Sequence, residues 1–205
     1  MIVIVDYGMG NLHSVENKVH RLGARSMIST DPQEIENAEK LILPGVGSFA
    51  AGMKNLEGRS LLAPLRKRAI VEGAPLLGIC LGMQLMTQKS EEGSALGLGW
   101  IAGETKKLDF SQMPKKLRVP HVGWNTLLPL RPDLLLQEVP PDASFYFVHS
   151  YFVLCSNEAD VVAMTHYGLD VAAVIHHANL YGTQFHPEKS HEWGFQVLKN
   201  FIESA

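Results

Sequence analysis

The stretch Pro-Leu-Leu-Gly-Ile-Cys-Leu-Gly-Met-Gln, residues 75–84, joins a buried-strand pattern to a helical one. The apolar run Pro75–Ile79 has the length of a buried strand, and the helical pattern Leu81–Gln88 begins only one residue later. A strand that passes directly into a helix is typical of α/β proteins, because parallel strands need crossover helices. The stretch therefore predicts an α/β fold.

The same alternation runs through the first half of the chain. Ile2–Val5 and Lys40–Leu43 are further short apolar runs, and apolar residues at helical spacing follow the first of them as far as Gly23. Thr30-Asp31-Pro32 is typical of a helix start, and a Leu- and Ala-rich helix is expected at Leu61–Glu72. We expect a parallel sheet with helices on both faces.

The second half is expected to consist mostly of strands, followed by an amphipathic helix near Glu192–Ile202. The overall expectation is one domain, residues 1–205, with a central mostly parallel sheet that is flanked by helices and extended by antiparallel strands. The expected strands are Ser144–Leu154, Val161–His166, Val171–His177 and Tyr181–His186, the last two joined by the turn His177-Ala178-Asn179-Leu180.

Composition excludes several classes of protein. The chain has 205 residues, 46% hydrophobic and 19% charged, with a net charge of −3 and no long run of either sign, which argues against nucleic-acid binding and a polybasic membrane anchor. The N-terminal MIVIVDYGMG lacks the basic region of a signal peptide. No apolar stretch approaches the roughly 18 residues of a membrane span. We expect a cytoplasmic protein that contacts neither nucleic acid nor membrane.

Cys80 is the first candidate for chemistry. Gly78-Ile79-Cys80-Leu81-Gly82 has the G-x-C-x-G form of a nucleophile elbow, in which a sharp turn presents the side chain at the carboxyl end of a strand. The following helix N-terminus favours the thiolate, which is the reactive form. A buried structural cysteine is the alternative interpretation, and it is the preferred one for Cys155, which lies beside an apolar run.

A cysteine nucleophile needs a base and a group that orients the base. His186 and Glu188 stand two residues apart around Pro187, and side chains at this spacing on an extended chain point the same way. The carboxylate would fix the tautomer of His186 and stabilise its imidazolium form.

Other histidines and glycines give weaker signals. The pair His176-His177, with His166, has no recurring ligand spacing, so no metal site is expected. His149 is either a satisfied core histidine or a residue that lines the site. The glycines of Gly8–His13 lack the third glycine of a dinucleotide-binding fingerprint.

Acyl chemistry also needs donors for an oxyanion. The backbone N–H of Leu81, directly after Cys80, is the natural first donor. Pro44-Gly45-Val46-Gly47 could supply the second, because its glycines let N–H groups turn toward a ligand, although these glycines could equally serve only a turn.

These residues together resemble a known family. The chain resembles the Cys-His-Glu glutamine amidotransferases of the first class, through the segments Gly-Ile-Cys-Leu-Gly-Met-Gln and Gln-Phe-His-Pro-Glu. More narrowly, it resembles the glutaminase subunits of imidazole glycerol phosphate synthase. The resemblance implies a flavodoxin-like fold and spans residues 6 to 190. Its segments are Asp6–Leu12, Pro44–Phe49, Gly78–Gln84, Pro120–Asn125, Tyr146–Tyr151 and Gly182–Ser190.

The resemblance implies a role for each matching position. Cys80 would attack the carboxamide of glutamine, with His186 as acid and base and Glu188 as its orienting partner. No metal or cofactor is implied. Backbone N–H groups at Val46 and Leu81 would hold the oxyanion, and Gly47, Gln84, Ser150 and Tyr151 would hold L-glutamine.

The resemblance also implies a partner. Ammonia released into water at pH 7 would be mostly protonated and no longer nucleophilic, so it must pass directly to a second site. In the family that site belongs to a (β/α)8-barrel cyclase subunit, which forms a heterodimer and makes imidazole glycerol phosphate and the aminoimidazole carboxamide ribotide in histidine biosynthesis. The expected docking face is Tyr7–Asn11, Pro120–Asn125 and Lys189, although Lys189 could equally be a solvated lysine.

Other functions remain open at this stage. The chain could be the glutaminase subunit of another synthase, such as pyridoxal phosphate synthase. It could also be a non-catalytic binding partner or a cysteine peptidase, although an intact Cys80-His186-Glu188 set argues against the first of these.

Overall fold

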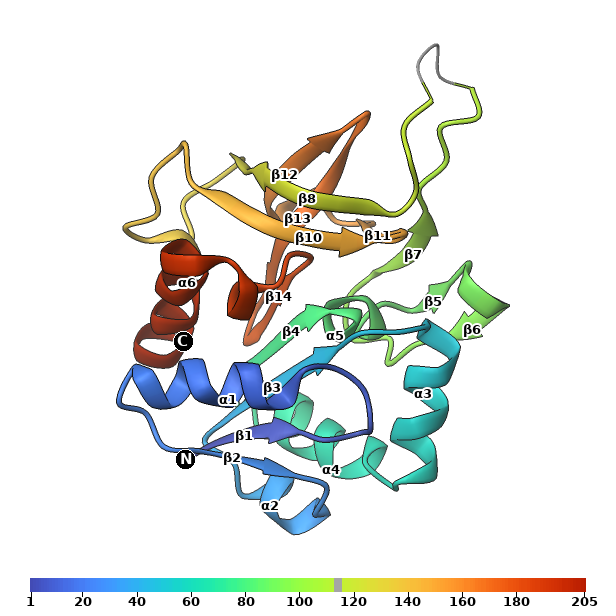
Figure 1. Ribbon diagram of the computed structural model, residues 1–205. Coiled ribbons are helices and arrows are strands. Elements are labelled where there is room, and N and C mark those ends of the chain that lie inside the picture. Colours follow the sequence, from blue (N-terminus) through green and yellow to red (C-terminus); the bar gives the residue numbers. More distant parts are fainter. Residues whose placement is uncertain (113–115) are drawn as a thin grey trace.

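The structure, a computed structural model, describes residues 1–112 and 116–205 and is built around an eight-stranded sheet (Figure 1). Five neighbouring strands are parallel, and three more are added in antiparallel pairings. The expectation of a mostly parallel sheet extended by antiparallel strands is confirmed. In order across the sheet the strands are β2 (Ser26–Ser29), β1 (Ile2–Val5), β3 (Lys40–Gly45), β4 (Leu76–Cys80), β14 (Leu180–Thr183), β13 (Leu169–His177), β12 (Val161–Tyr167) and β9 (Leu128–Pro129).

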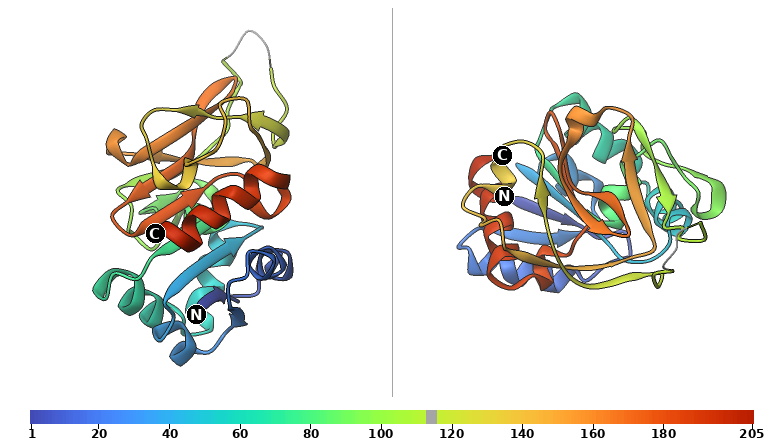
Figure 2. Two further views of the ribbon diagram at one scale, coloured as in Figure 1. Left: turned by 90° about the vertical axis from the view of Figure 1, so that its left-hand side faces the viewer. Right: turned by 90° about the horizontal axis from the view of Figure 1, so that it is seen from above.

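Helices cover the parallel part of the sheet on both faces (Figure 2). Successive residues of β1 point to opposite faces, so Val3 joins the core under one set of helices and Ile4 the core under the other. The core that contains Ile4 is covered by α1 (Leu12–Arg21) and α6 (His191–Ser204). The core that contains Val3 is covered by α2 (Pro32–Glu36), α3 (Phe49–Gly58), α4 (Leu62–Arg66) with its π-helical extension Lys67–Val71, and α5 (Leu81–Leu85).

Several elements differ in extent from the expectation. The predicted helix start is confirmed, because Asp31 accepts a hydrogen bond from the backbone N–H of Gln33 at 2.8 Å. The predicted helix Leu81–Gln88 ends three residues early, where the Thr87 hydroxyl donates to the carbonyl of Gln84 at 2.8 Å. Strand β2 and helix α3 were not expected. The two glycines of α3 weaken its helical pattern.

The segment Ser144–Leu154, expected as one strand, is two strands that belong to different sheets. The first, β10 (Ser144–His149), pairs with β8 (His121–Thr126). No glycine or proline marks the break at Ser150, so only the long-range pairing partners define it. The second strand, β11 (Tyr151–Cys155), pairs with β7 (Gly103–Lys107), whose sheet also holds β5 (Lys89–Ser90) and β6 (Ala95–Leu96).

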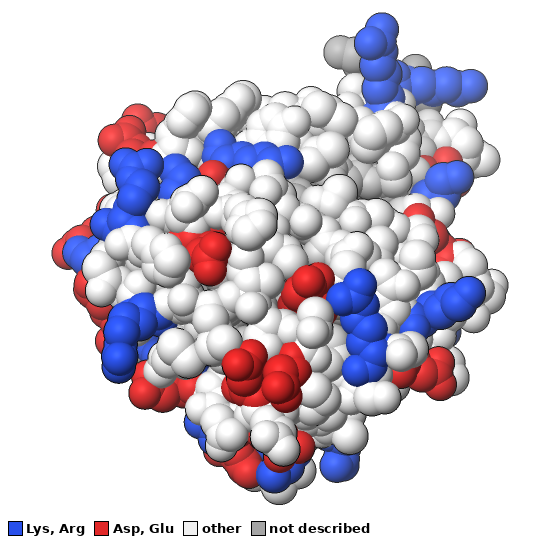
Figure 3. All heavy atoms as spheres, turned by 60° about the horizontal axis from the view of Figure 1, so that its bottom comes forward, with Lys and Arg blue, Asp and Glu red and all other residues white. Residues whose placement is uncertain are grey.

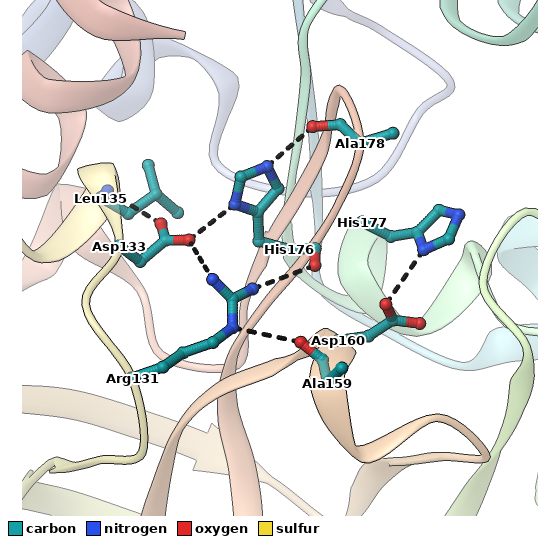
Figure 4. A network of polar contacts seen from close by, with 8 residues as sticks. All are labelled: Arg131, Asp133, Leu135, Ala159, Asp160, His176, His177 and Ala178. Atoms are coloured by element: carbon teal, nitrogen blue, oxygen red, sulfur yellow. Dashed lines mark hydrogen bonds and ion pairs between the residues drawn. The ribbon is translucent and has the colours of Figure 1, made fainter.

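A polar network attaches the chain before the 3-10 turn Leu134–Leu136 to the β13–β14 hairpin (Figure 4). The ring of His176 lies between two oxygen acceptors, with Nδ1 2.6 Å from Asp133 Oδ2 and Nε2 2.7 Å from Ala178 O. Both nitrogens can donate only when the ring is protonated. The hydrogen bond to Asp133 accordingly raises the pKa of His176.

The neighbouring His177 points the other way and pairs with Asp160 at 3.0 Å. The adjacent histidines therefore contact different carboxylates. Within residues 1–112 and 116–205, no group of His, Cys, Asp and Glu is arranged to hold a metal ion.

Replacing His176 with Gln should make stability less dependent on pH. Because the folded-state pKa is raised, the contribution of the imidazolium is complete below its unfolded value of about 6.5 and is lost as the pH rises through the folded value. Urea unfolding should show the wild type roughly 1 kcal/mol more stable than His176→Gln in acid. The difference should shrink above neutral pH. A difference that is the same at all pH values would contradict this account.

The surface carries both signs of charge. On the face shown in Figure 3, acidic and basic side chains are interspersed around apolar and neutral surface. Among the described residues, none of the helices combines the length and apolar character needed to cross a bilayer.

Candidate active site

Cys80 is the last residue of β4 and immediately precedes α5, and its φ of 52° lies in the left-handed region. The G-x-C-x-G form predicted a sharp turn between two glycines, and the unusual backbone falls on Cys80 itself. Gly78 and Gly82 serve close packing instead. A Cβ on Gly82 would collide with the Leu43 carbonyl oxygen, and one on Gly78 would lie 2.7 Å from backbone atoms of α5. The glycines therefore let α5 pack directly on β3 and β4.

His186 and Glu188 meet as the sequence predicted, although not on an extended strand. The strand β14 ends at Thr183, and Glu188 lies in the 3-10 turn Pro187–Lys189. Nδ1 of His186 is 2.8 Å from Oε1 of Glu188, and the two side chains are 1% and 2% exposed. Proline starts the turn readily because its φ is preset, so the compact turn replaces the predicted strand spacing.

The charge on His186 is set by its neighbours. Burial disfavours the imidazolium, but the interactions with Cys80 and Glu188 outweigh it and raise the pKa of His186 above its ordinary 6.5. Within the described chain, Nε2 of His186 is buried and makes no hydrogen bond of ordinary geometry. The ring therefore has one nitrogen held by Glu188 and the other available for proton transfer.

A cavity of about 230 Å³ opens at Cys80. It is smaller than the roughly 300–1,000 Å³ of sites for drug-sized ligands, which suits a small metabolite. Three larger cavities in the described part of the chain, of about 310, 500 and 710 Å³, do not include Cys80 in their walls, and none of them is lined by a histidine. The Cys80 cavity brings together every residue expected to hold the oxyanion or the substrate: Val46, Gly47, Leu81, Gln84, Ser150 and Tyr151.

Further residues line this cavity that the sequence did not assign to it. Glu92 is its acidic side chain, and its Oε2 accepts the backbone N–H of Phe49 at 2.6 Å. Pro120 and Val148 complete the wall. Gln184 is not among the lining residues but reaches the sulfur from within the protein: it is fully buried, and its Nε2 donates to Cys80 Sγ at 3.5 Å.

His149 lines the cavity, which decides between its two interpretations. Its Nδ1 is 2.9 Å from the carbonyl of Tyr151, so this nitrogen donates, and Nε2 accepts from Nδ1 of His121 at 3.0 Å. Burial lowers the pKa of His149 to about 3 and that of His121 to about 4. Both rings are therefore neutral at pH 7, and the hydrogen bond from His121 holds the ring of His149 in the wall of the site.

Comparison with known proteins agrees with this geometry. Residues 3–205 match the family model described as glutamine amidotransferase class-I. The chain belongs to this family. Imidazole glycerol phosphate synthase subunit HisH 2 of Methanococcus maripaludis is 44% identical to this amidotransferase, with 100% of both chains covered. Subunit HisH of Moorella thermoacetica is 48% identical, covering 98% of this chain and 94% of the relative.

Solved structures share the fold of the amidotransferase at lower identity. A putative GMP synthase protein from Thermoplasma acidophilum superimposes with a TM-score of 0.74 at 20% identity, covering 98% of this chain and 91% of the other. A structure described as glutamine amidotransferase gives a TM-score of 0.73 at 19% identity, with 99% and 98% covered. At these identities the likeness concerns the fold.

The two cysteines of the amidotransferase should differ sharply in reactivity. Burial, aided by Asp160, raises the pKa of Cys155 to about 12, so its thiolate is scarce near pH 7. Iodoacetamide at neutral pH should label Cys80 at least about tenfold faster, as measured by peptide mass spectrometry. Cys155→Ser should leave the fast labelling intact and Cys80→Ser should remove it. Equal labelling of both cysteines would contradict the assignment of Cys80.

Proposed function

We propose that residues 1–205 form the glutaminase domain of an imidazole glycerol phosphate synthase and act in the cytoplasm. The domain hydrolyses L-glutamine to glutamate and ammonia and passes the ammonia to a separate (β/α)8-barrel cyclase subunit. The observation that carries the proposal is that Cys80 lines a small cavity and interacts with His186, which is in turn held by the buried Glu188. Full-length relatives named as subunits of that synthase support the choice of pathway.

The geometry supports a two-step acyl transfer through Cys80. With the thiol proton already on His186, the Sγ thiolate forms a bond to the carboxamide carbon of glutamine. His186 then protonates the departing nitrogen, the C–N bond breaks, and ammonia leaves a glutamyl thioester. Water attacks the thioester with His186 as base, which releases glutamate and restores the thiolate.

The oxyanion of both steps would lie between two backbone donors. Leu81 supplies the N–H directly after the nucleophile, at the start of α5. The second donor would come from Val46, which lines the same cavity and follows β3. Gly47, at a φ of 130°, gives this loop a backbone conformation that other residues rarely adopt.

Glu92 fits the α-ammonium group of glutamine, since it is the acidic side chain of the cavity. Glu92→Gln should raise KM for glutamine by roughly tenfold, because a charge-assisted contact of about 1.5 kcal/mol is weakened, and it should change kcat less. The adjacent Glu91→Gln is the matched control, because Glu91 lies outside this cavity and accepts the backbone N–H of Lys107. Steady-state kinetics with the cyclase partner would measure KM and kcat of both variants. The same KM for Glu92→Gln and Glu91→Gln would contradict the role of Glu92.

The docking face for the cyclase would surround the mouth of the cavity. Val46 lines the cavity and is 47% exposed, and Val122, which pairs with the lining residue Val148, is 55% exposed. Trp124, on the same strand as Val122, is 48% exposed, and exposed apolar side chains of this size are typical of an interaction surface. Trp124 stacks on His191 with ring centroids 4.8 Å apart. Lys189 is exposed, with its Nζ 5.8 Å from the ring centre of Tyr146 in a cation–π contact.

Cys80→Ala should separate the two halves of the reaction. In a complex with the barrel cyclase, the variant should lose synthesis that depends on glutamine and keep synthesis that uses added ammonium salts. The wild-type chain alone should release glutamate slowly and accelerate markedly when the cyclase is added. Equal glutamate release with and without the partner would contradict the proposal.

A further inference from the structure

Gln184 has no part in the mechanism described above, yet it contacts the reacting sulfur. It follows β14 directly and is fully buried, and its backbone N–H donates to the carbonyl of Ala173 at 2.9 Å. Residue Thr183 of β14 lies beside Ile79 of β4 in register, so the next position is level with Cys80. Nε2 of Gln184 then reaches Sγ of Cys80 at 3.5 Å.

The direction of the Gln184 amide is fixed by a chain of hydrogen bonds that starts at a backbone carbonyl. The carbonyl oxygen of Tyr151 can only accept, so the group of Gln84 that faces it at 2.9 Å must be the amide nitrogen. The same nitrogen lies 3.2 Å from Gln184 and donates its second hydrogen to Oε1. Gln184 must therefore turn its own N–H₂ group toward Cys80.

The reverse orientation of Gln184 would be unfavourable at both ends. Its Nε2 would face Nε2 of Gln84, which puts two donors against each other. Its Oε1 would face Cys80, where a carbonyl oxygen repels a thiolate. The contacts with Gln84 and with Cys80 therefore select the same orientation of the Gln184 amide. This orientation is strongly favoured, because a buried amide is costly to leave unpaired.

We propose that Gln184 is a further catalytic residue, which donates a hydrogen bond to the Cys80 thiolate and holds the amide of Gln84 in the orientation that binds substrate. The proposal rests on the proposed role of Cys80 as nucleophile. His186 must give up its proton to the leaving nitrogen, but the amide of Gln184 does not titrate. It therefore stabilises the thiolate both before attack and when the sulfur leaves the thioester.

The same hydrogen bonds define what Gln84 offers to glutamine. Both hydrogens of its amide nitrogen are used, by Tyr151 and Gln184. Gln84 lines the cavity, so its Oε1 is the atom left to accept an N–H of the substrate. Loss of Gln184 should therefore affect both the reactivity of Cys80 and the binding of glutamine.

Three variants of the full-length chain test the proposal. Gln184→Met removes the donor and the acceptor with little change in volume. Gln184→Glu keeps an acceptor for Gln84 but places a carboxylate oxygen against Cys80. Thr183→Val is the matched control, since it changes the adjacent buried side chain, whose hydroxyl has no hydrogen-bond partner within the described residues.

The measurement is the rate of Cys80 alkylation by iodoacetamide as a function of pH, which needs neither glutamine nor the cyclase. The midpoint of the curve should move upward by about one pH unit in Gln184→Met, because a hydrogen bond to a charged group is lost. It should move further in Gln184→Glu and stay in place in Thr183→Val. With the cyclase present, glutaminase kcat of Gln184→Met should fall at neutral pH and recover partly at higher pH, which a merely structural role would not produce.

A second measurement covers the case in which the Gln184 variants do not fold. In the wild type, the side-chain amide NMR signals of Gln184 should shift with pH at the same midpoint as the alkylation rate, and in Cys80→Ser they should not. Unchanged alkylation curves in the folded Gln184 variants, or amide signals that do not respond to Cys80, would overturn the proposal. If glutamate release were absent in the wild type while the alkylation shift was present, the proposed function would fail and the role of Gln184 toward the sulfur would stand.

Discussion

The positive φ at Cys80 is the constraint on which the rest of the site depends. A non-glycine residue keeps such a backbone only when its surroundings hold it, at a cost of order 1–3 kcal/mol. Here the support comes from the close approach of α5 to β3 and β4, which the missing side chains of Gly78 and Gly82 allow. The turn places Cys80 in the wall of the cavity, where other strands supply the remaining groups.

Sheet topology decides which groups meet the sulfur. Because β14 is the parallel neighbour of β4, the chain that leaves it carries Gln184, His186 and Glu188 past Cys80 in succession. The break between β10 and β11 adds a second wall, with the carbonyl of Tyr151 as its fixed acceptor. His149 and His186 then differ in protonation within one site. Burial lowers the pKa of His149, helped by the nearby histidines, whereas Cys80 and the carboxylate of Glu188 raise the pKa of His186 against the effect of burial.

The sequence predicted the parts of this site that depend on local spacing. Cys80 could be chosen because strand, glycines and helix follow one another within ten residues, and His186 could be paired with Glu188 because only one residue separates them. The break at Ser150 and the position of Glu92 depend on pairings between distant segments, and no local residue type signals them. Gln184 stood within the Gln-Phe-His-Pro-Glu motif, but its purpose is visible only when β14 is aligned with β4 and Gln84 is placed beside Tyr151.

The central claim is that Cys80 carries the glutamyl group during turnover. Rapid acid quenching of the amidotransferase–cyclase complex with glutamine, followed by peptide mass spectrometry, tests it directly. The account predicts a glutamyl adduct on the peptide that contains Cys80 and none on the peptide that contains Cys155. Steady release of glutamate with no adduct on Cys80 at any quench time, or an adduct on another residue, would contradict it.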